Sequence, residues 1–153
     1  MNASSRKPEP CDALVLYGVT GDLARKKIFP SLYAMAKRGA LNVPVIGVAS
    51  SPWTQEQLCQ RATDSINEHG GIDDPAAMET LLSKLSYVSG NYKNPETFAA
   101  IRTALGSAQR PAHYLAIPPA LFETMITGLR DSGLAKNARL IVEKPFGRDL
   151  ESA

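Results

Sequence analysis

Short apolar runs alternate along the chain with longer segments in which apolar residues recur every three or four positions. Runs of the first kind are typical of buried β-strands, and segments of the second kind are typical of amphipathic helices. Five runs predict strands, at residues 13–17, 43–49, 86–89, 113–117 and 138–142. Pro44 is compatible with the start of the second strand, because the first residue of a strand needs no ladder hydrogen bond.

Capping residues and prolines mark where the intervening helices begin. Thr54 and Gln57 form a capping box, which predicts a helix over residues 55–67. Asp74 and Asn94 each precede a proline, the usual arrangement of a cap and a first helical residue. We expect helices to begin at Asp22, Gln55, Pro75, Pro95 and Pro119. The last of these is expected to bury Leu121, Phe122, Met125, Ile126 and Leu129.

Strands that alternate with helices predict parallel βαβ units and an α/β fold. We expect a Rossmann-like, doubly wound parallel sheet with strand order 3-2-1-4-5 and helices on both faces, because crossover connections are almost always right-handed. Pro30 falls about eight residues into the first helix, where it removes a backbone hydrogen bond. The helix should therefore be kinked there or consist of two abutting pieces, unless it is simply short.

A glycine turn between the first strand and the first helix is the strongest candidate binding site. Gly18 and Gly21 stand three residues apart, and Ala24 follows at the next third position. In this setting glycines allow the backbone to approach a pyrophosphate, and the N–H groups of the first helical turn face it. The spacing differs from Gly-x-Gly-x-x-Gly, so an ordinary tight turn is the alternative.

Ligands of doubly wound sheets bind beyond the carboxyl ends of the strands. Ser50 and Ser51 follow the second strand, where a carboxylate would indicate NAD and an arginine NADP. Two hydroxyls permit a 2′-phosphate, and Lys26 or Lys27 could supply positive charge. The residues therefore favour NADP and leave NAD open. Glu143 and Lys144 follow the fifth strand, as a surface ion pair or as ligand-binding residues.

Composition excludes several classes of function. The net charge of +2 gives no indication of nucleic-acid or membrane binding, and no apolar run approaches the roughly 20 residues of a membrane helix. Cys11 and Cys59 are isolated thiols without metal-ligand spacing, which favours a cytoplasmic protein without disulfides or a metal site. Residues 1–11 are expected to form a disordered tail.

A general base is not evident from the residues alone. His69 lies in a glycine-rich loop, and His113 stands at the amino end of its predicted strand, away from the ligand-binding edge. We expect each to be structural or solvated.

Three stretches together resemble glucose-6-phosphate dehydrogenase. Residues 18–30, Gly-Val-Thr-Gly-Asp-Leu-Ala-Arg-Lys-Lys-Ile-Phe-Pro, are similar to the nucleotide turn of that family. Residues 114–119, Tyr-Leu-Ala-Ile-Pro-Pro, and residues 141–150, Ile-Val-Glu-Lys-Pro-Phe-Gly-Arg-Asp-Leu, resemble its fourth-strand and fifth-strand motifs. Residues 87–92 fit more weakly. The glucose–fructose oxidoreductase type shares a Glu-Lys-Pro at the fifth strand but lacks the Gly-Asp-Leu-Ala turn.

The resemblance implies an NADP-dependent dehydrogenase that oxidises glucose 6-phosphate to the phosphogluconolactone in the pentose phosphate pathway, with residues 12–150 as its coenzyme domain. By position, Thr20, Gly21, Asp22 and Leu23 would hold the pyrophosphate with Lys27 nearby, and Gly18 would belong to the same cofactor-binding turn. Tyr92 would border the adenine, and Ala116, Ile117 and Pro118 would line the nicotinamide. Lys144 would reach cofactor and sugar phosphate across a cis bond to Pro145.

The chain also departs from the family. Ser50 stands where the family commonly has arginine, and Phe122 where tyrosine is common. The family's catalytic histidine lies in a downstream motif, within a β+α domain that also provides substrate contacts and the oligomer interface, and neither motif nor domain has sequence here. We therefore expect a coenzyme domain that is inactive alone, the alternative being a short protein that binds a nucleotide and catalyses nothing.

Overall fold

The computed structural model describes residues 11–142. Its centre is a sheet in the order β3-β2-β1-β4-β5, and each neighbouring pair is parallel. The strands are β1 (Ala13–Tyr17), β2 (Val45–Ala49), β3 (Leu85–Ser89), β4 (Pro111–Leu115) and β5 (Arg139–Val142). This topology confirms the fold class and the strand order that the sequence predicts.

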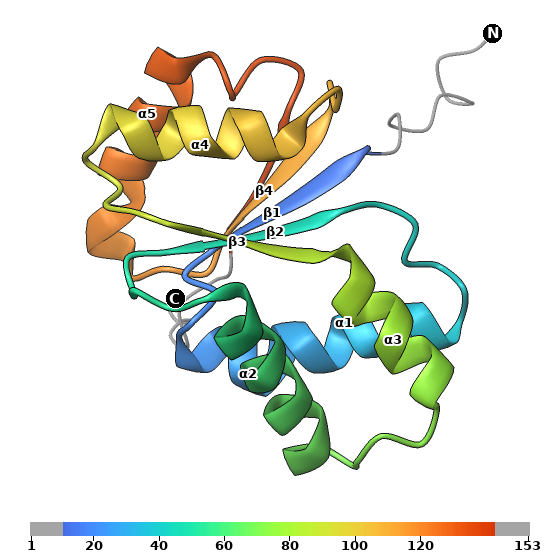
Figure 1. Cartoon of the computed structure of the whole chain (residues 1–153). Helices are drawn as coiled ribbons and strands as arrows, with labels where there is room; N and C mark the ends of the chain where they lie inside the picture. The colour runs from blue at the N-terminus through green and yellow to red at the C-terminus, as the bar shows by residue number, and fades with distance from the viewer. Residues whose placement is uncertain (1–10, 143–153) are drawn as a thin grey trace, which may run out of the picture.

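Helices cover both faces of the sheet (Figure 1). On one face lie η2 (Ala24–Ile28), α1 (Phe29–Lys37), α2 (Gln55–Glu68) and α3 (Pro75–Lys84). On the other face lie α4 (Pro95–Leu105) and α5 (Phe122–Ser132), the latter preceded by the short turn η3 (Pro119–Leu121). Successive residues of β1 supply the two cores, because a strand turns alternate side chains to opposite faces. Leu16 packs with the first group of helices, and Val15 and Tyr17 pack with the second.

The first helical segment consists of two abutting pieces, as Pro30 predicts. The π-helical turn η2 ends at Ile28, and α1 begins at Phe29. Pro30 is the second residue of α1, and the helical backbone continues from η2 through Ile28 and Phe29 without a break. The π-helical turn therefore lies just before the residue whose missing N–H interrupts the hydrogen-bond ladder. Phe29 and Tyr33 are buried beside Leu32, so the buried stripe of this segment is wider than one row of residues.

The predicted caps are present. Thr54 Oγ1 accepts a hydrogen bond from Gln57 N, and Gln57 Oε1 accepts one from Thr54 N, which completes the capping box of α2. Asp74 accepts from Ala77 N at the start of α3, and Asn94 accepts from Glu96 N at the start of α4. Local sequence therefore determines where these helices begin.

The boundaries of two strands differ from the prediction by two residues, and those of β3 and β5 by one. β2 begins at Val45, because Pro44 contributes only its carbonyl, which accepts a hydrogen bond from Leu14 N. β4 lies two residues earlier than predicted, at Pro111–Leu115. Asp12 accepts hydrogen bonds from Gln109 N and Arg110 N, which fixes where β4 enters the sheet. His113 is consequently the central residue of β4 and not its amino end.

The helix after Pro119 buries fewer residues than predicted. Met125 and Leu129 are buried, but Ile126 is 40% exposed, so its predicted burial is wrong. Ile126 lies with Leu140 along a shallow cavity where α5 passes β5, the edge strand of the described sheet. Leu140 and Val142 of that strand are exposed as well.

Within residues 11–142, none of the helices has the length and apolarity needed to cross a membrane. The predicted tail lies outside the described residues apart from Cys11, as do Glu143, Lys144 and the predicted cis bond to Pro145.

Candidate nucleotide site at the carboxyl edge of the sheet

The turn after β1 sits between the ends of the two neighbouring strands. Gly18 N and Val19 N both donate to the Val48 carbonyl of β2, at 2.8 and 3.3 Å. On the other side, a side chain at Gly18 would overlap the Ala116 carbonyl and approach Ile117 Cγ2 to 3.0 Å. Gly18 also has a φ of +85°, which side chains disfavour. Glycine is therefore required here by the protein itself.

Gly21 differs from Gly18 in what surrounds it. Its N–H closes the turn onto the Gly18 carbonyl at 3.0 Å, and it is exposed. A Cβ at Gly21 would meet only the Gly18 carbonyl, at 3.3 Å, and its φ is not in the left-handed region. Among the described residues, none of the neighbouring side chains would clash with a side chain at this position. A ligand that approaches the backbone here would clash with one, which is a reason for glycine.

The helical N-terminus follows directly. Asp22 and Leu23 are helical, and Arg25 N donates to the Gly21 carbonyl at 3.3 Å. Helix geometry leaves the N–H groups that precede this bond without partners in the helix, and they carry the positive end of the dipole. The basic residues Lys26 and Lys27 are exposed on the next turn. This end of the segment can hold an anion.

Two hydroxyl groups join this turn to the end of β2. Thr20 Oγ1 and Ser51 Oγ lie 3.0 Å apart. The Ser51 carbonyl accepts hydrogen bonds from Tyr87 Oη and from Ser89 Oγ, both on β3. Ser50 is exposed beside them. The structure thus brings together the turn and the serines that sequence placed after two different strands.

Arg61 of α2 contacts the same turn through the Thr20 carbonyl, and the sequence alone did not indicate it. Its Nη2 donates to the Thr20 carbonyl at 2.9 Å, and its guanidinium carbon lies 5.5 Å from the centre of the Trp53 ring. Arg61 Nε is buried without a hydrogen-bond partner in the described part of the chain. One arginine within an amphipathic helix carries no sequence signal that would distinguish it from a solvated one.

Four further predicted residues lie at the same edge. Tyr92 follows β3, its hydroxyl donates to the Val48 carbonyl at 3.3 Å, and its ring packs edge-on against Tyr17. Burial raises the pKa of Tyr92 to about 12, so the hydroxyl remains a donor. Ala116 and Ile117 are half-buried and Pro118 is exposed after β4. Lys144 lies outside the described residues, two positions beyond the end of β5.

The histidines lie away from this edge. His113 is buried in β4, where Nε2 faces the Leu134 carbonyl at 3.0 Å and Nδ1 faces Tyr17 Oη at 2.9 Å. A carbonyl can only accept, so Nε2 carries the proton and Nδ1 accepts from the Tyr17 hydroxyl. Burial lowers the pKa of His113. His69 caps the far end of α2 and is exposed. Their structural and solvated roles agree with expectation.

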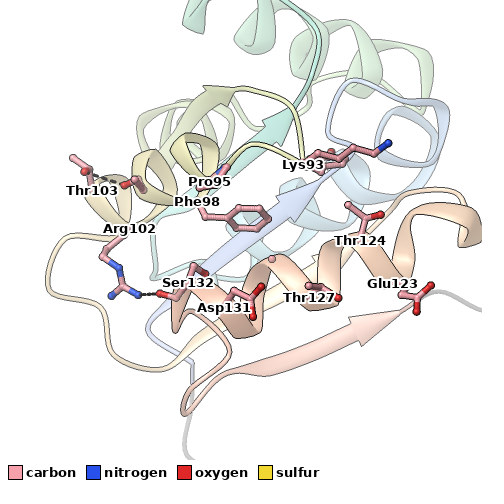
Figure 2. Close-up of a pocket in the computed structure, with 13 residues that line it drawn as sticks. Lys93, Pro95, Phe98, Arg102, Thr103, Glu123, Thr124, Thr127, Asp131 and Ser132 are labelled. Atoms are coloured by element: carbon pink, nitrogen blue, oxygen red, sulfur yellow. Dashed lines mark hydrogen bonds between the residues drawn. The ribbon is translucent and has the colours of Figure 1, made fainter.

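A cavity of about 910 Å³ forms a groove between α4 and α5 (Figure 2). It begins near Lys93 and Glu123 and continues along both helices to Arg102 and Asp131. The helices meet closely at Gly128, where a side chain would overlap the Phe98 ring. The groove follows the helix pair away from the glycine turn. Residues 11–142 contain no cluster of side chains suited to holding a metal ion.

Comparison with known proteins gives a consistent result. The family model for "Glucose-6-phosphate dehydrogenase, NAD binding domain" matches residues 15–153. The chain is 42% identical over 142 residues to glucose-6-phosphate 1-dehydrogenase 1 of Mycobacterium tuberculosis, covering 93% of this chain and 30% of that protein. It is 34% identical over 166 residues to the Saccharomyces cerevisiae enzyme, covering 100% of this chain and 33% of the relative.

Solved structures agree. Glucose-6-phosphate 1-dehydrogenase from Mycobacterium avium superposes with a TM-score of 0.85 at 42% identity, covering 94% of this chain and 32% of that one. A glucose-6-phosphate dehydrogenase in complex with glucose 6-phosphate superposes with a TM-score of 0.76 at 30% identity, covering 92% and 32%. The chain therefore spans about a third of the length of these relatives.

Proposed function

Because the chain belongs to the family of glucose-6-phosphate dehydrogenase NAD-binding domains, we propose that it binds NADP at the carboxyl edge of its sheet and serves as the coenzyme domain of a cytoplasmic dehydrogenase. The observation that supports this most directly is the contrast between its two turn glycines. Gly18 is required by the packing of the protein, whereas Gly21 is exposed at a helical N-terminus and a Cβ there would meet only the Gly18 carbonyl, at 3.3 Å. A glycine without a structural reason at that place indicates a ligand.

The described residues fit a dinucleotide. In the proposed complex the N–H groups of Asp22 and Leu23 donate to the pyrophosphate, Gly21 lets it approach the backbone, and Lys27 lies nearby. Thr20 and Ser51 offer hydroxyls at the ribose 2′ position, and Ser50 lies beside them. Tyr92 borders the adenine, and residues 116–118 line the nicotinamide. Lys144 would contact the sugar phosphate substrate.

The bound coenzyme would supply the hydride acceptor for C1 of glucose 6-phosphate. Residues 11–142 place no imidazole or carboxylate pair at this edge that could take the proton from the C1 hydroxyl. That step would require the histidine which the family carries in its downstream domain. We therefore propose that this chain alone binds coenzyme but does not turn over substrate.

Isothermal titration with NADP and NAD tests the binding proposal. We expect saturable binding of both and a modest preference for NADP, because Ser50 lacks a guanidinium. Ser50→Arg should strengthen NADP binding by on the order of 1.5–3 kcal/mol, the range for a hydrogen bond to a charged group. A preference of the unmodified chain for NAD by tenfold or more would contradict the coenzyme assignment.

An assay with glucose 6-phosphate and NADP tests the second half of the proposal. No NADPH should form above background at micromolar concentrations of this chain. Turnover that depends on both substrates would show that the chain holds a proton acceptor of its own.

A further inference from the structure

The two hydroxyls that join the glycine turn to the end of β2 lack an adjacent positive charge from the turn or the strand. Thr20 and Ser51 form the pair, and Ser50 beside them is also neutral. A 2′-phosphate carries a charge between −1 and −2 near neutral pH, as phosphate monoesters do. Protein hydroxyls bond to a ribose 2′-hydroxyl and to a 2′-phosphate alike, so on their own they discriminate weakly between NAD and NADP. An arginine at such a site favours the 2′-phosphate strongly.

Arg61 is the cation that the structure ties to this pair. Its Nη2 donates to the Thr20 carbonyl at 2.9 Å, while the Thr20 hydroxyl lies 3.0 Å from that of Ser51. One residue thus connects the guanidinium to the two hydroxyls. The Trp53 ring, 5.5 Å from the guanidinium carbon, restricts the side chain from another direction.

The positive charge of Arg61 is also not paired with a carboxylate in the described part of the chain. The two ion pairs found in the described residues use Arg25 with Glu68 and Lys37 with Asp73, so the nearby Arg25 is already neutralised. Arg61 has no carboxylate partner in that part of the chain, and its Nε–H is buried without an acceptor. A guanidinium has five N–H donors, and one of them is occupied here by a hydrogen bond, to Thr20. The buried Nε–H cannot itself meet an anion, so a bound phosphate would be held by the Nη groups.

We propose that Arg61 supplies the positive charge for the 2′-phosphate and thereby determines the preference for NADP over NAD, in place of the arginine that Ser50 does not provide. The inference rests on the proposed function, because it concerns the same dinucleotide site. It differs from a purely structural role, in which Arg61 only holds the turn against α2. A structural role would affect NAD and NADP equally, since both share the pyrophosphate, whereas the charge acts on the 2′-phosphate alone.

The test measures dissociation constants for NADP and NAD in four proteins: the unmodified chain, Arg61→Gln, Arg61→Lys and Arg38→Met. Glutamine keeps an N–H donor for the Thr20 carbonyl and removes the charge, and lysine keeps the charge. Arg38 is exposed at the opposite end of α1 and controls for the loss of one positive charge. Thermal unfolding confirms that each variant folds.

Arg61→Gln should weaken NADP binding tenfold or more and NAD binding less than threefold. Arg61→Lys and Arg38→Met should each keep the NADP:NAD ratio within threefold of the unmodified chain. The inference is overturned if the ratio is unchanged in Arg61→Gln, or if both affinities fall together. Should Arg61→Gln not fold, Arg61→Lys carries the test, and an NADP:NAD ratio that differs from that of the unmodified chain by more than threefold in that variant refutes the proposal.

Failure of the proposed function gives a different pattern. If the unmodified chain binds neither nucleotide, the dinucleotide site and the role of Arg61 both fall. If it binds both but Arg61→Gln leaves the ratio intact, only the role of Arg61 falls.

Discussion

Gly18 and Gly39 have similar backbone conformations but different surroundings. Their φ angles are +85° and +72°, yet a side chain at Gly18 would overlap the Ala116 carbonyl, and one at Gly39 would meet nothing within 4 Å. Gly39→Ala should therefore cost about 1–2 kcal/mol of unfolding free energy, the price of a left-handed alanine. Gly18→Ala should cost about 1–3 kcal/mol more, because the neighbouring loop must move.

Urea denaturation of both variants measures this difference directly. Gly39→Ala serves as the control for backbone strain, so any excess in Gly18→Ala reports the close approach of the loop after β4. Equal losses in the two variants would mean that the turn does not pack against Ala116 as described.

At the scale of single elements, α2 combines the capping box with Arg61, which contacts the glycine turn. Thr54→Ala removes the side-chain acceptor for Gln57 N and should cost about 1 kcal/mol of unfolding free energy. Thr103→Ala is the matched control, because Thr103 is exposed and lies within α4, away from its first turn. This change should leave the unfolding free energy unchanged or raise it slightly, because alanine favours helix. Chemical denaturation compares the two. A control that loses as much stability as Thr54→Ala would argue against the cap.

Elements whose signals are local were predictable from sequence. The box of Thr54 and Gln57, the caps before Pro75 and Pro95, and the interruption at Pro30 depend on residues within one turn, and the structure contains all of them. The parallel sheet followed from alternation of element types, and Gly18 and Gly21 marked the turn.

Features that depend on tertiary neighbours were not predictable. The entry of β4 is fixed by Asp12, about 100 residues earlier in the chain, and Ile126 is exposed because α5 passes the edge strand there. Arg61 reaches Thr20 across 41 positions, and the pairing of Thr20 with Ser51 joins two strand ends. A single sequence contains no periodicity that reports such contacts.

For the whole molecule, His113 links stability to pH. Burial lowers the pKa of His113 in the folded protein below the value of about 6.5 that an unfolded histidine has. As pH falls, the unfolded chain binds the proton first, so stability from this site is complete above about pH 6.5 and is lost as pH falls through the folded pKa. The Tyr17 hydroxyl, whose pKa burial raises, stays a donor throughout this range.

Melting temperatures measured from pH 7.5 down to pH 4.5 should therefore decline below about pH 6.5, and His113→Gln should flatten that decline. His69→Gln, at the exposed end of α2, controls for the loss of a histidine outside the core. Two carboxylates titrate in a separate, lower pH range. The Gln109 N–H lowers the pKa of Asp12 and the Tyr33 hydroxyl lowers that of Asp73, so their contributions disappear only below about pH 4. A decline that His113→Gln leaves intact would assign the transition to other groups.

The central claim is that the turn after β1 holds the pyrophosphate of a dinucleotide. The measurement that tests it most directly is NADP titration of the unmodified chain and of Gly21→Val, with thermal unfolding of both. Because a Cβ at Gly21 meets only the Gly18 carbonyl at 3.3 Å, the variant should fold with little loss of melting temperature, while its side chain occupies the space of the pyrophosphate and abolishes binding. Equal NADP affinity in a folded Gly21→Val would contradict the account.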